Sequence, residues 1–127
     1  MNRLADFAVT LVELGGVLRA LPHIESARRH VGPRPLMETL RRQARHTRQR
    51  GPMARQCLQR AIRWVDVCLA GGANCYRRAL LEVALDRGAA EEPLALGLSA
   101  QGQRLAGHAW LAGEPGAAAA YDLVIHV

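Results

Sequence analysis

The chain has 127 residues, half of them hydrophobic, which is enough for one domain with its own core and no need of disulfides. Its three cysteines form no Cys-x-x-Cys pair, which argues against a disulfide framework and a tetrahedral metal site and favours a reducing cytoplasm. With no signal peptide visible and no apolar run long enough to span a bilayer, we expect a protein without membrane segments.

The formal net charge of +6 is concentrated in the N-terminal half. Residues 1–60 hold twelve arginines against four acids, whereas residues 61–127 hold five against seven. All basic residues except the histidines are arginines, a bias that favours a GC-rich, bacterial genome. The arginine-rich stretch over 41–60 has no interleaved aromatic residues, so a solvated face or a docking surface for an acidic partner is favoured over nucleic-acid binding.

Apolar residues at helical spacing predict two helices in this basic half. The first contains Leu4 to Leu18 and is expected to end at Pro22. Residues 23–34 are mixed in character and predict a connection. The second helix is expected to begin at Pro35, with a thin apolar stripe on one side and arginines on the other.

A third and stronger helical pattern runs from residue 57 to residue 69 and stops at the glycine pair Gly71-Gly72. Cys57 and Cys68 both fall on its apolar stripe, where free cysteines commonly act as small hydrophobic residues. We therefore expect both thiols to be buried in the core.

The fourth helix is expected to begin at Cys75, with Asn74 as its N-cap, and to end at Arg87-Gly88. A thiol at a helix N-terminus faces unpaired backbone N–H groups and the positive end of the helix dipole, and both favour the thiolate. This is where a nucleophile would be placed.

Beyond Gly88 the period of the pattern changes from helical to alternating. Three strands are predicted, over 94–99, 104–111 and 121–127, with turns at 101–102 and 113–116. We expect them to form an antiparallel meander with the fourth helix packed across it. The sequence thus predicts an α+β fold in which N-terminal helices are followed by a small antiparallel sheet.

A histidine and an aspartate follow the cysteine in the order that cysteine hydrolases use. His108 lies 33 residues after Cys75, and Asp122 lies 14 residues after His108. We expect the two to lie on adjacent strands that face the start of the helix. Cys75 would attack as the thiolate, His108 would carry the proton, Asp122 would orient His108, and the backbone N–H of Cys75 would stabilise an oxyanion, without a metal or cofactor.

Other histidines and aromatic residues leave alternatives open. His126 is either a second candidate base or a strand residue without a role, and Trp110 either walls the site or fills the core. The remaining histidines, His23, His30 and His46, lie among arginines and are expected to be solvated or capping residues.

The motifs at these positions resemble a known family. Cys75-x-x-Arg78-Ala79-Leu80 at a helix start, the strand segment 94–98, and His108-Ala109-Trp110 before a later aspartate are similar to the transglutaminase-like bacterial proteases that remove the leader from lasso-peptide precursors. In that family the helix begins Cys-Leu-x-Arg-Ala-Leu and the histidine stands in Ala-His-Ala-Trp-Val. The resemblance spans about residues 55–123, and Tyr76 and Gly107 replace the usual leucine and alanine.

The resemblance implies a papain/transglutaminase-like core with Cys75, His108 and Asp122 as the catalytic triad. Tyr76, Gly107 and Trp110 are the expected substrate-binding positions. The implied partners are the leader of the precursor peptide, a separate leader-recognition protein and an ATP-dependent macrocyclase, with no nucleic acid and no membrane. We expect one domain over 1–127, with a basic helical part over 1–52 and a catalytic core over 53–127.

A second hypothesis needs no catalysis. The basic helices could form a docking module, or the chain could be a degenerate relative that binds peptide without cutting it.

Overall fold

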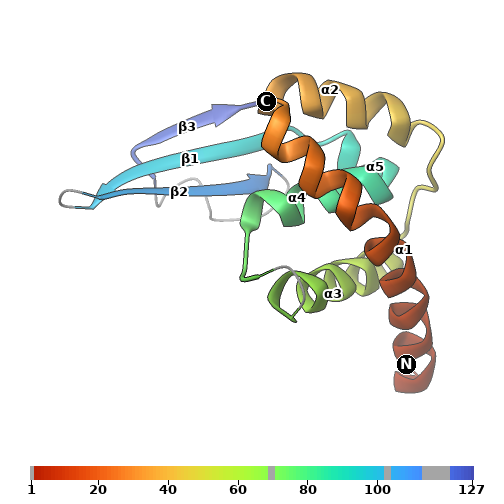
Figure 1. Ribbon diagram of the computed structural model, residues 1–127. Coiled ribbons are helices and arrows are strands. Elements are labelled where there is room, and N and C mark those ends of the chain that lie inside the picture. Colours follow the sequence, from red (N-terminus) through yellow and green to blue (C-terminus); the bar gives the residue numbers. More distant parts are fainter. Residues whose placement is uncertain (1, 69–70, 102–103, 113–120) are drawn as a thin grey trace.

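The computed structural model describes residues 2–68, 71–101, 104–112 and 121–127, and within them it confirms the expected α+β fold (Figure 1). No helix in these ranges is long and apolar enough to cross a membrane. The helices precede the strands in the order α1 (Arg3–His30), α2 (Pro33–Ala44), α3 (Pro52–Cys68), α4 (Cys75–Leu85), α5 (Arg87–Ala90), β1 (Leu94–Gln101), β2 (Arg104–Leu111) and β3 (Leu123–His126).

The first helix, α1, continues through Pro22, so the prediction that it ends there is wrong. Proline inside a helix removes a backbone hydrogen bond, and tertiary contacts of the last turns compensate for that loss. Ile24 is fully buried in the core, and Glu25 forms ion pairs with Arg28 and with Arg77 of α4. The predicted connection over 23–34 is therefore helical as far as His30, and α2 begins at Pro33, two residues before the predicted start at Pro35.

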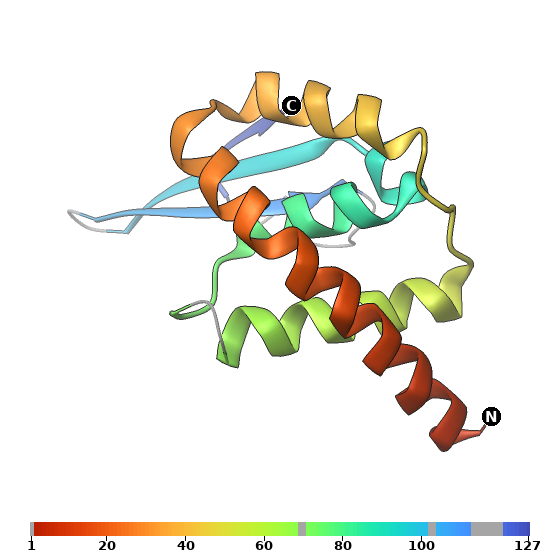
Figure 2. The same cartoon turned by 45° about the vertical axis from the view of Figure 1, so that its right-hand side comes forward.

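The helices enclose one hydrophobic core together with one face of the sheet. In Figure 2, α4 lies between α2 and α3, and α1 crosses in front of it. The apolar stripe predicted for α2 is confirmed, because Leu36, Met37, Leu40 and Ala44 are buried while Arg34 and Arg42 are exposed. Both the basic half and the C-terminal half contribute to this core, whose largest buried side chains include Val17, Ile24, Met37, Leu40, Leu58, Leu80, Leu81, Leu94 and Leu111.

The sheet is antiparallel, but its strand order is β2-β1-β3, so the predicted meander is wrong. The strand β1 pairs with both neighbours: Leu98 lies opposite Gly107 on one side and opposite Leu123 on the other. Leu94 and Ala95 are fully buried. The strand β1 thus takes the centre of the sheet, where it pairs with a strand on each side.

The junction after α4 also differs from the prediction. The helix ends at Leu85, and the buried Asp86 then caps the short helix α5 by accepting the backbone N–H of Gly88 at 3.1 Å. Its carboxylate also accepts the backbone N–H of Arg50 at 3.2 Å. Gly88 therefore lies inside α5 and does not follow the end of α4.

The turns predicted at 101–102 and 113–116 fall wholly or partly outside the described residues.

Replacing Pro22 by alanine is expected to stabilise the protein. Pro22 is exposed, so alanine loses little packing and restores one N–H to the helix. We expect a gain of about 2 kcal/mol in the free energy of unfolding, measured by urea titration followed by circular dichroism. A proline inside a helix destabilises the folded state by more than it stabilises the protein through restricting the unfolded chain. Pro33→Ala at the first residue of α2, where proline is tolerated, is the control and should change little. Equal effects of the two substitutions would contradict an uninterrupted α1.

Candidate active site

The start of α4 is shaped by the residues that precede it. Asn74 is extended and its side-chain oxygen accepts the backbone N–H of Arg77 at 3.0 Å, which confirms the predicted N-cap. Gly71 and Gly72 have φ values of 74° and 118°, in the region that favours glycine. The chain can therefore turn sharply after α3 and present Cys75 as the first residue of α4.

A buried ion pair fixes this turn. The carboxylate of Asp66 on α3 is fully buried and lies 2.6 Å from the Nη2 atom of Arg77, which is 2% exposed. The same carboxylate accepts the backbone N–H of Asn74 at 3.0 Å. Arg77 also donates to the carbonyl of Gly72 at 2.6 Å and to Glu25 of α1 at 3.2 Å. Two helices and the turn before Cys75 are thus all held by one guanidinium group.

Glu25 at the outer end of this network is held in its charged form. Hydrogen bonds from Arg28 and from Arg77 outweigh the effect of burial and lower the pKa of Glu25 from 4.5 to about 2. A carboxylate whose pKa is lowered by folding stabilises the fold above its unfolded pKa and loses that contribution as the pH falls through its folded pKa. The contribution of Glu25 is therefore complete above about pH 4.5 and declines towards pH 2.

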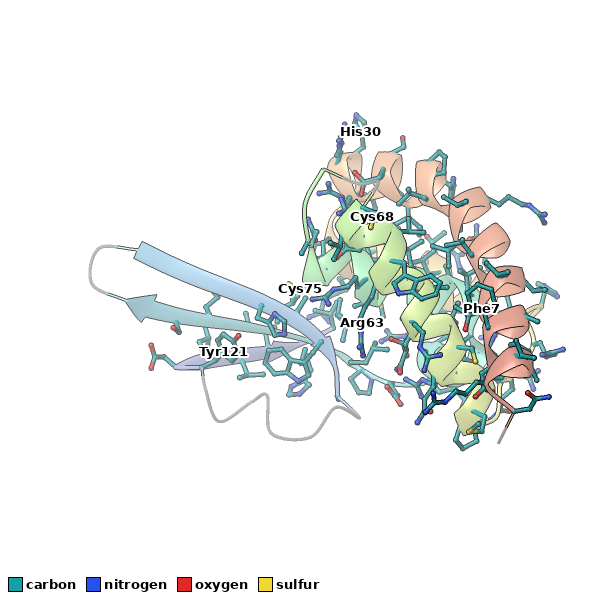
Figure 3. The ribbon with its side chains drawn as sticks, turned by 90° about the horizontal axis from the view of Figure 1, so that it is seen from below. Phe7, His30, Arg63, Cys68, Cys75 and Tyr121 are labelled. Carbon is teal, nitrogen blue, oxygen red and sulfur yellow. The ribbon has the colours of Figure 1, made fainter. Side chains whose placement is uncertain are left out.

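Cys75 lies where the helices meet the edge strand β2 (Figure 3). Its Sγ atom accepts the backbone N–H of Ala109 at 3.3 Å. Cys75 and His108 both line a pocket of about 550 Å³ between α3, α4 and β2. The structure thus places two of the three residues expected for catalysis in one pocket, and within the described residues no hydrogen bond joins the Cys75 sulfur to His108. The other described residues that line the pocket are Gln59, Ile62, Arg63, Arg78, Ala79, Glu82, Ala109, Trp110 and Leu111.

The imidazole of His108 belongs to a stack of three rings. Its centroid lies 5.7 Å from the ring of Trp110 and 5.9 Å from the ring of Tyr121, and those two rings lie 5.3 Å apart. The buried Gly97 makes room for them, because a Cβ atom there would lie 2.6 Å from Tyr121 and 2.7 Å from Trp110. Packing against these aromatic rings restricts the orientation of the histidine.

Asp122 is placed differently from the prediction. Because β1 lies between β2 and β3, His108 and Asp122 are not on adjacent strands. The Asp122 carboxylate accepts the backbone N–H of Ala100 at 3.2 Å, and within the described residues no hydrogen bond joins it to His108. The alternative base, His126, is exposed on β3, at the opposite edge of the sheet from β2.

The three expected substrate-binding residues have different surroundings. Trp110 lines the pocket and is 4% exposed, so it both walls the site and fills the interior. Tyr76 and Gly107 are not among the residues that line the pocket. The hydroxyl of Tyr76 is buried without a hydrogen-bond partner in the described part of the chain, and its burial raises the pKa of this tyrosine.

The other two cysteines differ in exposure. Cys57 is buried, which confirms the expectation, whereas Cys68 is exposed, so its predicted place in the core is wrong. Cys68 is the last residue of α3. No group of three or more potential metal ligands occurs among the residues that the structure describes.

Comparison with models of known families, with curated proteins and with solved structures finds no match for this chain. The function of the site is therefore inferred from its own geometry and from the motif resemblance.

The residues that hold Cys75 in place were not predicted from the sequence. Asp66 follows Val65 and Ile62 on α3, close to the apolar stripe, and a single acid beside such a stripe indicates a buried cationic partner. That signal could have identified Asp66. Its partner Arg77 comes eleven residues later on another helix, beyond the range of spacing rules for a single helix.

Removing the Asp66 carboxylate is expected to destabilise the fold strongly. Asp66→Ala leaves the buried Arg77 charge without its closest partner, which costs about 3–5 kcal/mol in comparable buried pairs, and chemical denaturation measures this loss. Arg78→Ala is the control, because Arg78 is partly exposed and lies farther from Asp66, at 3.4 Å. It should cost less than about 1 kcal/mol. Similar losses for both variants would contradict a central role for the Asp66–Arg77 pair.

Proposed function

We propose that this protein is a cysteine peptidase that removes the leader from a ribosomally synthesised precursor of the lasso-peptide type. The observation that carries the proposal is the shared pocket of Cys75, at the first residue of α4, and His108, on the adjacent edge strand β2. A thiol at a helix N-terminus that shares a pocket with a histidine supports the proposal, because thiol peptidases need a histidine that can come within hydrogen-bond reach of the sulfur.

In the proposed reaction Cys75 loses its proton to His108 and its sulfur attacks the scissile carbonyl carbon. Asn74 caps the Arg77 N–H, so the backbone N–H groups of Cys75 and Tyr76 in the first turn of α4 would donate to the developing oxyanion. The intermediate then collapses, the C–N bond breaks, and His108 returns the proton to the leaving amine. Water hydrolyses the resulting thioester and regenerates the thiol.

The orientation of His108 is assigned to the aromatic stack. Trp110 and Tyr121 pack against the imidazole, whereas Asp122 accepts a hydrogen bond from Ala100. The proposal therefore rests on a Cys75–His108 dyad, and it places Asp122 in a structural role in the sheet. The papain/transglutaminase-like core is part of the same proposal, since it requires a cysteine at a helix start facing a histidine on an antiparallel strand.

The partners follow from the same hypothesis. The substrate is the leader end of a precursor peptide, a separate leader-recognition protein would present it, and an ATP-dependent macrocyclase would act on the released core peptide in a bacterial cytoplasm. A metal or cofactor is not needed for this mechanism.

The alternative function is a basic docking module that binds peptide without cutting it. The observation in its favour is the cationic surface at the end of α2, where the exposed Arg42 and Arg45 line a pocket together with Arg41 and Glu38. Arg41 itself is engaged in the fold, because it donates to the carbonyls of Ala90 and Val127.

Cys75→Ala is expected to abolish cleavage of the cognate precursor by more than about a hundredfold, since covalent catalysis is lost while Cys75 contributes only partly to the core. Mass spectrometry of the cleaved peptide measures the rate. Cys57→Ala and Cys68→Ala should remain active, and Asp122→Asn should retain most activity. Full activity of Cys75→Ala would overturn the peptidase assignment, and inactivity of a folded Asp122→Asn would reinstate the triad.

Alkylation rates provide a test that needs no substrate. Cys68 is an exposed thiol and serves as an internal reference, so faster reaction of the less exposed Cys75 near neutral pH would indicate activation by its surroundings. Slower reaction of Cys75 than of Cys68 would favour the docking module.

A further inference from the structure

The charged side chains that line the pocket beside Cys75 differ in the number of partners that each has within the protein. Two guanidinium groups, those of Arg63 and Arg78, line it together with one carboxylate, that of Glu82, among the residues that the structure describes. Which of these groups is available to a ligand depends on the partners that each already has.

Glu82 is fully engaged by the protein. Its Oε1 atom accepts Arg55 Nε at 2.8 Å and Gln59 Nε2 at 2.8 Å, and the residue is 6% exposed. Arg55 in turn binds Glu92 through two further hydrogen bonds, at 3.0 and 3.1 Å. The negative charge of Glu82 is thus balanced by Arg55 of α3 and does not neutralise Arg63 and Arg78.

Arg63 differs from the other arginines around the site. It is exposed on α3, and within the described ranges it has no hydrogen bond or ion pair to any other residue. Figure 3 shows its side chain on α3 between the helices and the sheet, close to Cys75. By contrast, the neighbouring Arg78 lies 3.4 Å from the carboxylate of Asp66, which is already paired with Arg77.

We propose that Arg63, supported by Arg78, forms a subsite for an acidic side chain of the peptide substrate within a few residues of the scissile bond. The inference rests on the proposed function, because it uses the same pocket. A guanidinium group binds a carboxylate through two parallel hydrogen bonds, and the buried Trp110 and Ile62 line the same pocket. Because the Glu82 carboxylate is already paired with Arg55, it repels an incoming carboxylate less than Arg63 and Arg78 attract it.

The subsite is tested with peptides that carry aspartate, asparagine or lysine at each of the three positions on either side of the scissile bond. Wild-type protein should cleave one aspartate peptide with a kcat/KM about tenfold higher than its asparagine counterpart, the size expected for a partly exposed charge-assisted contact. Arg63→Ala should remove this preference, and Arg63→Glu should shift it to the lysine peptide. Arg60→Glu is the matched control, because Arg60 is an exposed arginine on the same helix that lines a different pocket, between α1 and α3.

Binding to the Cys75→Ala protein separates this inference from the proposed function. If the wild-type protein cleaves no peptide, the proposed function fails, while tighter binding of an aspartate peptide that depends on Arg63 still supports the subsite. If the wild-type protein cleaves and binds the aspartate, asparagine and lysine peptides equally at every position, the subsite is wrong even though the peptidase assignment stands. An equal effect of Arg60→Glu and Arg63→Glu would also overturn it.

Discussion

The buried pair of Arg77 and Asp66 is the interaction on which the site depends. Two charges removed from water are costly, and here the cost is offset by further hydrogen bonds to a turn carbonyl, a turn N–H and a carboxylate of α1. The contacts to the Gly72 carbonyl and the Asn74 N–H hold the segment just before Cys75, and the contact to Glu25 ties the start of α4 to α1. The pair therefore specifies position more than it adds stability: it determines where α4 begins relative to α3, and so where the thiol lies against β2.

The sheet supplies the other half of the site, and one glycine leaves the space that the aromatic rings of this half occupy. Gly97 on the central strand leaves space in which Trp110 and Tyr121, from opposite sides of β1, meet over the sheet and pack with His108. The helices thus position the candidate nucleophile and the sheet positions the candidate base. Between them lies a pocket whose available charge is positive, which links the chemistry of the site to the acidic side chain inferred for its substrate.

Local patterns predicted the parts of this arrangement that depend on neighbouring residues. The third helix, the Asn74 cap and the placement of Cys75 follow from periodicity and capping, and the structure agrees with them. The path of α1 through Pro22 and the strand order β2-β1-β3 depend on contacts between distant segments, which a single sequence does not display. The separation of Asp122 from His108 is a direct consequence of that strand order.

The most direct test of the account is a crystal structure of the wild-type protein with a peptide aldehyde derived from its substrate. We expect a covalent hemithioacetal on the Sγ atom of Cys75, with the His108 imidazole within hydrogen-bond distance of the sulfur or of the new oxygen and still stacked on Trp110 and Tyr121. An adduct on Cys68, or an adduct on Cys75 with His108 turned away and another side chain in its place, would contradict it.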